Sequence, residues 1–181
     1  MIGTSWGGLD AVSRLLDDLH EDVHQPIVVA QHRSPQSKNG GLERLLALHT
    51  QRVVSDAEDK KPLELDHVYV APSDYHVLVE HGYLALSTEA PVQFSRPSID
   101  VLFESAADAY GDRAVGIVLT GANEDGAAGL ARIKDRGGVA IVQEPTSSVR
   151  RTMPDAAIAA TTADAILPLE EIPPFLYGLC A

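Results

Sequence analysis

Short β-branched and apolar runs, separated by segments of helical periodicity, most constrain how this sequence can fold. The apolar runs lie at 27–30, 67–71, 114–119 and 139–142, and helical spacing is clear at 9–19, 99–110 and 126–136. Strands that are apolar throughout are typical of a parallel sheet covered by helices on both faces. The alternation therefore predicts an α/β fold with one doubly wound, mostly parallel sheet.

One segment breaks this alternation. Residues 76–80 and 83–86 flank His81-Gly82, which is the pattern of an antiparallel β-hairpin with glycine in its turn. His76 and His81 are expected at the surface. Shorter strands are expected at 53–54 and 165–167, and further helices at 41–48, 154–160 and 172–179. No linker long enough to divide the chain is present, so residues 1–181 are expected to form one domain.

The charge balance and the apolar pattern exclude several classes of function. Fourteen basic against 26 acidic side chains give a net charge of −12, and without a basic run no binding to nucleic acid is expected. No apolar run approaches the roughly 20 residues that span a bilayer. The first residues do not have the pattern of a signal peptide, so a cytoplasmic protein without membrane insertion is expected.

Metal and disulfide chemistry are not indicated either. The single cysteine, Cys180, allows no internal disulfide and no cysteine-based zinc site. His20 and His24 are four residues apart, but further ligands are missing, and a solvated helix end is expected there. No metal and no organic cofactor is expected.

The loop before the first helix carries the first candidate catalytic residue. Gly3-x-Ser5-x-Gly7 has the spacing of a nucleophile elbow, in which a tight strand-to-helix turn exposes a serine. The alternative interpretation is a glycine-rich connection whose serine caps the helix. Only Met1 and Ile2 precede this motif, so either its strand is very short or the natural protein has residues upstream.

Two further loops after strands carry the groups that a serine nucleophile needs. His32 follows the run at 27–31, and Asp125 ends the loop after the run at 114–119. A serine requires a general base, and the base works best when a carboxylate orients it. Since ligands bind beyond the carboxyl ends of parallel strands, Ser5, His32 and Asp125 are expected to converge at one sheet edge. The alternative for Asp125 is an N-cap of the helix that follows it.

Several motifs in order resemble one known family. The segments 3–8, 30–32, 96–107 and 119–129 are similar to the catalytic domain of CheB, the protein-glutamate methylesterase of chemotaxis, and the likeness covers nearly the whole chain. The resemblance implies hydrolysis of glutamate γ-methyl esters on the cytoplasmic helices of chemoreceptors, with glutamine deamidation in some members. It implies Ser5 as nucleophile, His32 as general base and Asp125 as its orienting carboxylate.

The departures from the family pattern concern the surroundings of the nucleophile. Trp6 stands where the family usually has a small residue, Ala122 where methionine is common, and Asn123 where glycine is common. Trp6, Gly121 and Ala122 are candidates for the oxyanion site or the substrate cleft. The receiver domain of typical members is not in this chain, so a response regulator acting in trans is a possible partner. Arg150-Arg151 is either a receptor contact or an ordinary surface pair.

Two other functions remain open at this stage. One is a catalytically weak homologue that binds a receptor or a signalling partner; the presence of all three triad residues favours the enzyme over it. The other is a nucleotide-binding module that uses residues 3–8 as a phosphate loop. The glycine spacing and the missing lysine are not typical of such loops.

Overall fold

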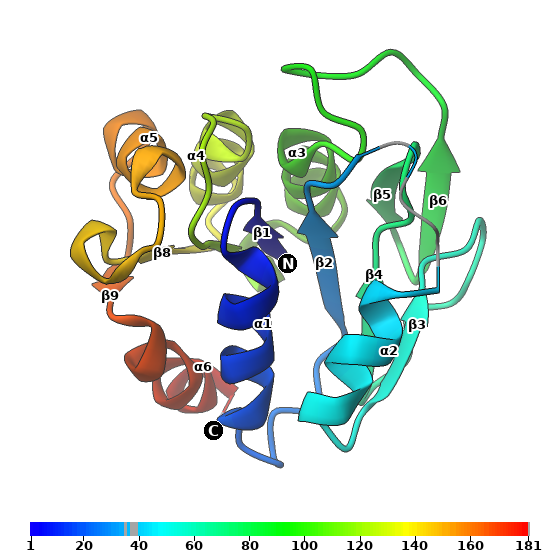
Figure 1. Ribbon diagram of the computed structural model, residues 1–181, viewed down its shortest axis with the longest axis horizontal. Coiled ribbons are helices and arrows are strands. Elements are labelled where there is room, and N and C mark those ends of the chain that lie inside the picture. The colour runs from blue at the N-terminus through cyan, green and yellow to red at the C-terminus, as the bar shows by residue number, and fades with distance from the viewer. Residues whose placement is uncertain (35, 37–39, 181) are drawn as a thin grey trace.

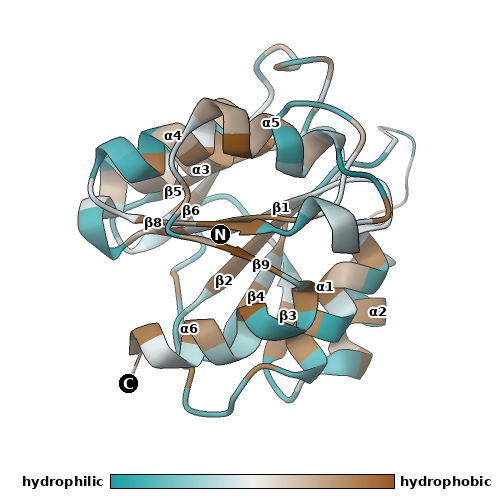
Figure 2. Ribbon diagram, turned by 90° about the vertical axis from the view of Figure 1, so that its left-hand side faces the viewer, coloured by the Kyte–Doolittle hydropathy of each residue, from teal (hydrophilic) through white to brown (hydrophobic). Residues whose placement is uncertain are grey.

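A seven-stranded parallel sheet between two layers of helices forms the body of the protein (Figures 1 and 2). This computed structural model describes residues 1–34, 36 and 40–180. The strands, in chain order, are β1 (Ile2–Thr4), β2 (Ile27–Gln31), β3 (Val53–Asp56), β4 (His67–Val70), β7 (Val115–Val118), β8 (Val139–Gln143) and β9 (Ala165–Leu167). Their spatial order is β3-β4-β2-β1-β7-β8-β9. The predicted doubly wound α/β fold is therefore confirmed.

The helices divide evenly between the two faces of the sheet, as Figure 2 shows. One layer contains α1 (Gly8–Asp17), α2 (Leu42–Leu46) and α6 (Ile172–Cys180), and the other contains α3 (Ile99–Tyr110), α4 (Ala127–Asp135) and α5 (Thr152–Ala160). Each layer encloses its own cluster of buried apolar side chains against the sheet. The helix expected at 41–48 is shorter, because its last turn is a 3₁₀ helix at Ala47–His49.

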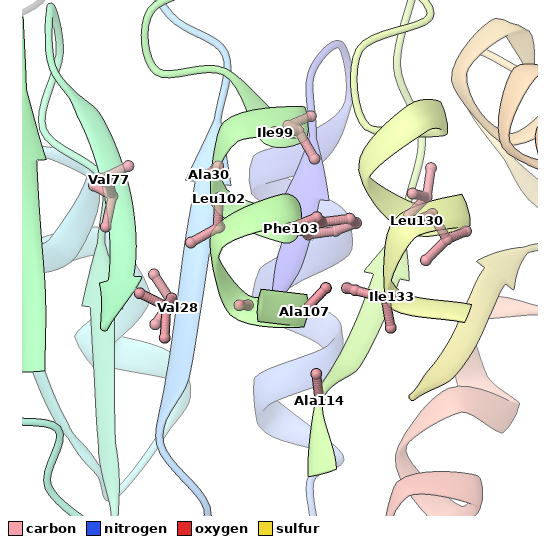
Figure 3. Packing of buried hydrophobic residues seen from close by; sticks show 14 of the residues in the cluster. Val28, Ala30, Val77, Ile99, Leu102, Phe103, Ala107, Ala114, Leu130 and Ile133 are labelled. Carbon is pink, nitrogen blue, oxygen red and sulfur yellow. The ribbon is translucent and has the colours of Figure 1, made fainter. Parts of the chain in front are cut away.

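Helices α3 and α4 pack directly against each other. Phe103 of α3 lies with Leu130 and Ile133 of α4 in the core between these helices and the sheet (Figure 3). Gly129 permits this approach, since a Cβ at that position would lie 2.6 Å from the Cβ of Phe103. Ser98 caps α3 through its side chain, as expected, and Gly111 ends the helix at a φ of 54°. This packing fixes the N-termini of α3 and α4 relative to each other.

The expected hairpin is formed by β5 (His76–Glu80) and β6 (Tyr83–Ser87), with Gly82 at a φ of 86° in the turn. The expectation that His76 lies at the surface is wrong. Its ring is buried, accepts a hydrogen bond from the Ser98 N–H at its Nδ1 and contacts the Ala90 carbonyl through its Nε2. His76 therefore ties the hairpin to the loop that precedes α3.

The chain reverses its direction of winding at the centre of the sheet. From β1 it forms β2, β3 and β4 on one side, with β3 at the edge, and it later returns to the other side of β1 as β7. The loops that follow β1 and β7 therefore flank a topological switch point, which is the usual place for a ligand site in such sheets. No helix among the described residues is long and apolar enough to cross a membrane.

Candidate active site

Ser5 lies at the turn between β1 and α1, at the switch point. Its N–H donates to the Thr120 carbonyl (3.0 Å), and its own carbonyl accepts from the Gly8 N–H (2.9 Å) and from Gln31 Nε2 (2.8 Å). Gly7 has a φ of 81°, a conformation that side-chain-bearing residues rarely adopt, and a Cβ there would lie 2.9 Å from Val149 Cβ. The backbone of Ser5 is therefore fixed on three sides at the N-terminus of a helix.

His32 follows the strand next to Ser5. Its N–H donates to the Thr4 carbonyl (3.0 Å), which continues the β1–β2 pairing and places the residues after the two strands side by side. The side chain is only 11% exposed, and its Nε2 lies 2.6 Å from Asp125 Oδ2. The structure thus brings His32 and Asp125 together from loops that are distant in the sequence.

Asp125 is completely buried and is surrounded by donors. Its carboxylate accepts from the Ser98 hydroxyl (2.8 Å) and from the N–H groups of Ile99 (2.7 Å) and Asp100 (3.0 Å). Burial by itself would raise the pKa of Asp125, but the hydrogen bonds from His32 and from the two backbone N–H groups outweigh it and hold that pKa below its ordinary value. Asp125 caps α3; the N-cap position of the helix that follows it, α4, is Gly126.

The ionised Asp125 fixes the tautomer of the imidazole. Because the carboxylate only accepts, Nε2 of His32 must carry the proton, and Nδ1 of the neutral ring holds the lone pair. Nδ1 lies 3.2 Å from Asn123 Nδ2, which donates to it in this tautomer. Among the described residues, the Ser5 hydroxyl has no hydrogen-bond partner. The hydrogen bond that a serine nucleophile makes to its general base is thus not formed between Ser5 and His32 in this structure.

A second buried carboxylate, Asp100, supports the first. Its Oδ1 accepts from the N–H groups of Gly126 (2.9 Å) and Gly129 (2.7 Å), and its Oδ2 accepts from Gln93 Nε2 (2.9 Å). Burial, together with the nearby charge of Asp125, raises the pKa of Asp100 to about 6. Sequence reasoning did not select this residue, since an aspartate in the first turn of a helix is common and carries no signal of its tertiary partners.

Thr120 joins the loops around the nucleophile. Its hydroxyl donates to the Trp6 carbonyl (2.9 Å) and accepts from the Arg150 N–H (2.9 Å), and its carbonyl accepts from the Thr4 hydroxyl (2.8 Å). Gln143 completes the support by accepting from the Thr120 N–H (2.9 Å). The turn that carries Ser5 is therefore held by a buried polar network as well as by the sheet.

No metal-binding arrangement accompanies these groups. In the described part of the chain, no cluster of three or more histidine, cysteine, aspartate or glutamate side chains could hold a metal ion. His24 contacts Asp66 (2.9 Å), and His20 stacks on the Tyr177 ring at 4.1 Å.

Comparisons with known proteins show the family of the chain. The sequence model of the CheB methylesterase family matches residues 1–176. The chain belongs to the CheB methylesterase family. The expected resemblance and the assignment to a family of hydrolases are thereby confirmed.

Relatives of the CheB family extend the comparison. A Leptospira interrogans protein named putative protein-glutamate methylesterase/protein-glutamine glutaminase is 43% identical over 95% of this chain and 89% of its own length. A Hahella chejuensis relative with the corresponding name is also 43% identical, but the aligned part is 48% of its length. The crystal structure of the Thermotoga maritima CheB methylesterase catalytic domain matches with a TM-score of 0.92 and 30% identity, over 98% of this chain and 96% of that one.

Two exposed aromatic side chains, Trp6 and Phe94, lie at the rim of the site. The Trp6 ring is 63% exposed, and the Arg150 guanidinium lies over it at 5.7 Å. Phe94 is fully exposed next to Ser95, whose Oγ lies 3.5 Å from Asn123 Nδ2. Trp6 is therefore not part of the core, and two aromatic side chains face solvent close to the candidate triad.

One of the oxyanion candidates must be corrected. The N–H of Gly121 donates to the Arg150 carbonyl (3.1 Å), and its carbonyl accepts from the Met153 N–H (3.1 Å), so the fold itself uses both groups. Gly121 is also buried, and a Cβ there would lie 2.6 Å from Met153 Cε. Ala122 is exposed, and neither its N–H nor that of Trp6 has an acceptor among the described residues. Trp6 and Ala122 remain candidate oxyanion donors.

Proposed function

We propose that this chain hydrolyses γ-methyl esters of glutamate side chains on the cytoplasmic helices of chemoreceptors, with Ser5 as the nucleophile. The observation that carries the proposal is the His32–Asp125 pair, which leaves the lone pair on Nδ1 of a histidine whose backbone N–H donates to Thr4, the residue before Ser5. The names of the curated relatives support glutamate methyl esters of a protein as the substrate class. By the same chemistry, glutamine side chains would be deamidated.

The reaction follows from the geometry of the three loops. Nδ1 of His32 takes the hydroxyl proton as Ser5 Oγ attacks the ester carbonyl, and Asp125 stabilises the imidazolium that forms. The oxyanion is stabilised by the N–H of Trp6 and by the positive end of α1. The imidazolium then returns its proton to the leaving methoxide, which departs as methanol. Water attacks the acyl-enzyme by the reverse proton route and releases the glutamate carboxylate; a glutamine substrate releases ammonia instead.

The rim of the site favours a helical protein substrate over a small ester. Trp6 and Phe94 offer exposed aromatic surface, and buried aromatic anchors commonly dominate protein contacts. Arg150 and Arg151 are exposed; the Arg150 guanidinium lies over the Trp6 ring, and Arg151 pairs with Asp155 at 2.7 Å. In a chain of net charge −12, such local positive groups would steer an acidic receptor helix to the site.

A response regulator that binds in trans is the proposed regulatory partner of the esterase. It would supply control by phosphorylation. Such a complex would act in the cytoplasm, where receptor helices and regulator meet.

One observation favours the alternative of a catalytically weak homologue that serves as a binding module. Asn123 occupies the lone pair of His32, and the Ser5 hydroxyl is not hydrogen-bonded to the base. A weak enzyme would still need the same rim residues to bind its receptor. An esterase and a binding module are therefore both expected to bind the receptor, and only the esterase is expected to turn the ester over.

Methanol release from a methylated receptor fragment tests the proposal. Wild-type protein is expected to release methanol in an amount equal to the esters lost, and Ser5→Ala to release none while retaining its melting temperature. Receptor binding without methanol release by the wild type would support the binding module and reject the esterase. Ammonia release from a glutamine-bearing fragment separately tests the deamidation.

A further inference from the structure

Asn123 contacts the ring nitrogen of His32 that would act as the general base for Ser5. A neutral imidazole has one donor nitrogen and one acceptor nitrogen, and Asp125 already engages the donor of His32. The remaining lone pair, on Nδ1, receives Asn123 Nδ2 at 3.2 Å. One lone pair in the ring plane accepts one strong hydrogen bond, so the Ser5 hydroxyl cannot donate to Nδ1 while the amide does.

The side-chain amide of Asn123 is held by weak hydrogen bonds. Its Nδ2 has two contacts, both long: Nδ1 of His32 and, at 3.5 Å, the hydroxyl oxygen of Ser95. Its Oδ1 is buried and has no hydrogen-bond partner among the described residues. An unsatisfied buried acceptor raises the free energy of the resting arrangement. The contact with His32 can therefore be broken at small cost.

From this geometry we infer that Asn123 is a positioning residue whose side-chain amide occupies the general base in the resting state. The amide must leave His32 Nδ1 before Ser5 can be deprotonated. The inference rests on the proposed role of Ser5 as the nucleophile. It adds a step that the triad alone does not contain: the resting enzyme has its base occupied, and binding of the ester has to displace the amide. The intrinsic reactivity of Ser5 is lowered in the resting state.

Reaction with a fluorophosphonate isolates this step, since the small probe bypasses receptor docking. Ser5 Oγ forms a bond to phosphorus, the phosphorus–fluorine bond breaks, fluoride leaves and the hydroxyl proton passes to His32 Nδ1. Removal of one competing neutral hydrogen bond corresponds to a rate increase of about 3- to 10-fold. Asn123→Ala, and Asn123→Gly as a second truncation, are therefore expected to label that much faster than wild type at pH 7.

The isosteric variant Asn123→Asp is expected to have the opposite effect on the rate of labelling. Its carboxylate cannot donate to Nδ1 and instead stabilises a proton there, which removes the lone pair that Ser5 needs, so labelling is expected to slow by about 10-fold or more. Glu124→Ala alters an exposed neighbour in the same loop and is expected to label at the wild-type rate. A merely structural role for Asn123 would slow labelling in all three Asn123 variants.

Two results would overturn the proposed role of Asn123. Labelling of a folded Asn123→Ala or Asn123→Gly variant at or below the wild-type rate would show that the amide does not compete with Ser5. Faster labelling of Asn123→Asp than of wild type would reject the proposed use of the Nδ1 lone pair. If folded wild-type protein is not labelled on Ser5 at all, the proposed function fails first, and that outcome is distinct from the other two.

Discussion

Asp100 and Asp125 cap each other's helices. Asp125 precedes α4 but accepts from the N-terminus of α3, whereas Asp100 lies in α3 and accepts from the Gly126 and Gly129 N–H groups at the start of α4. Each carboxylate satisfies orphan donors of the opposite helix. The exchange locks the two helix ends together, and the side chain that orients His32 is thus part of the α3–α4 interface.

We expect Asp125→Asn to damage both catalysis and stability. The variant puts an amide NH₂ among groups that all donate to position 125, so one donor loses its acceptor at a cost of about 1–3 kcal/mol of unfolding free energy. The wrong tautomer of His32 is then favoured, which should lower kcat by about 10³- to 10⁴-fold. Chemical denaturation and methanol release measure the two effects.

An intact kcat in Asp125→Asn would contradict the role of the carboxylate in fixing Nε2–H. The matched control is Asp112→Asn, which changes an exposed aspartate at the far end of α3. That variant is expected to keep wild-type turnover and stability.

The raised pKa of Asp100 predicts a pH dependence of stability. Between its unfolded value near 3.8 and its folded value of about 6, the folded state binds more protons than the unfolded state, so the free energy of unfolding falls as pH rises through this window. Asp100→Asn removes this titration. The stability of wild type relative to Asp100→Asn should therefore decrease by about 2–3 kcal/mol between pH 4 and pH 7.

Urea denaturation of the two proteins at several pH values checks this prediction. A constant difference from pH 4 to pH 7 would show that Asp100 titrates in the folded protein as it does in the unfolded chain. The lowered pKa of Asp125 acts with the opposite sign: its contribution is present above the unfolded value and is lost as pH falls further.

Trp6→Ala should weaken substrate binding with little loss of stability. The ring is 63% exposed, so its truncation removes contact surface at the site and leaves the core unchanged. We expect KM for a methylated receptor fragment to rise about 5- to 10-fold, more than kcat falls, which is the signature of lost uniform binding. Phe94→Ala should behave in the same way.

Leu48→Ala serves as the control, because Leu48 is comparably exposed but lies in the 3₁₀ turn after α2, away from the β1–α1 turn. Michaelis and melting curves on the same preparations decide the matter. A large drop in melting temperature with unchanged KM would show that Trp6 supports the fold.

The fold could be predicted because its signals are local. Continuous apolar runs identified the parallel strands, Gly82 identified the hairpin turn, and Ser98 identified the start of α3. The positions of Ser5, His32 and Asp125 after strands also followed from the pattern, because carboxyl ends of parallel strands meet at one edge.

The features that were missed depend on tertiary contacts. The burial of His76 results from a loop 14 residues away, and the capping by Asp125 acts on a helix 26 residues away instead of its own. The contact between Asn123 and His32 spans 91 residues. Neither propensity nor spacing encodes such pairs, so the occupied base could be seen only in the structure.

The most direct test of the central claim is to map the fluorophosphonate adduct by peptide mass spectrometry in wild type, Ser5→Ala and His32→Gln. The account predicts a single adduct on Ser5 in wild type, none in Ser5→Ala, and a loss of labelling of at least about 100-fold in His32→Gln, since the serine would lack its general base. An adduct on another residue, or His32→Gln labelled at the wild-type rate, would contradict it.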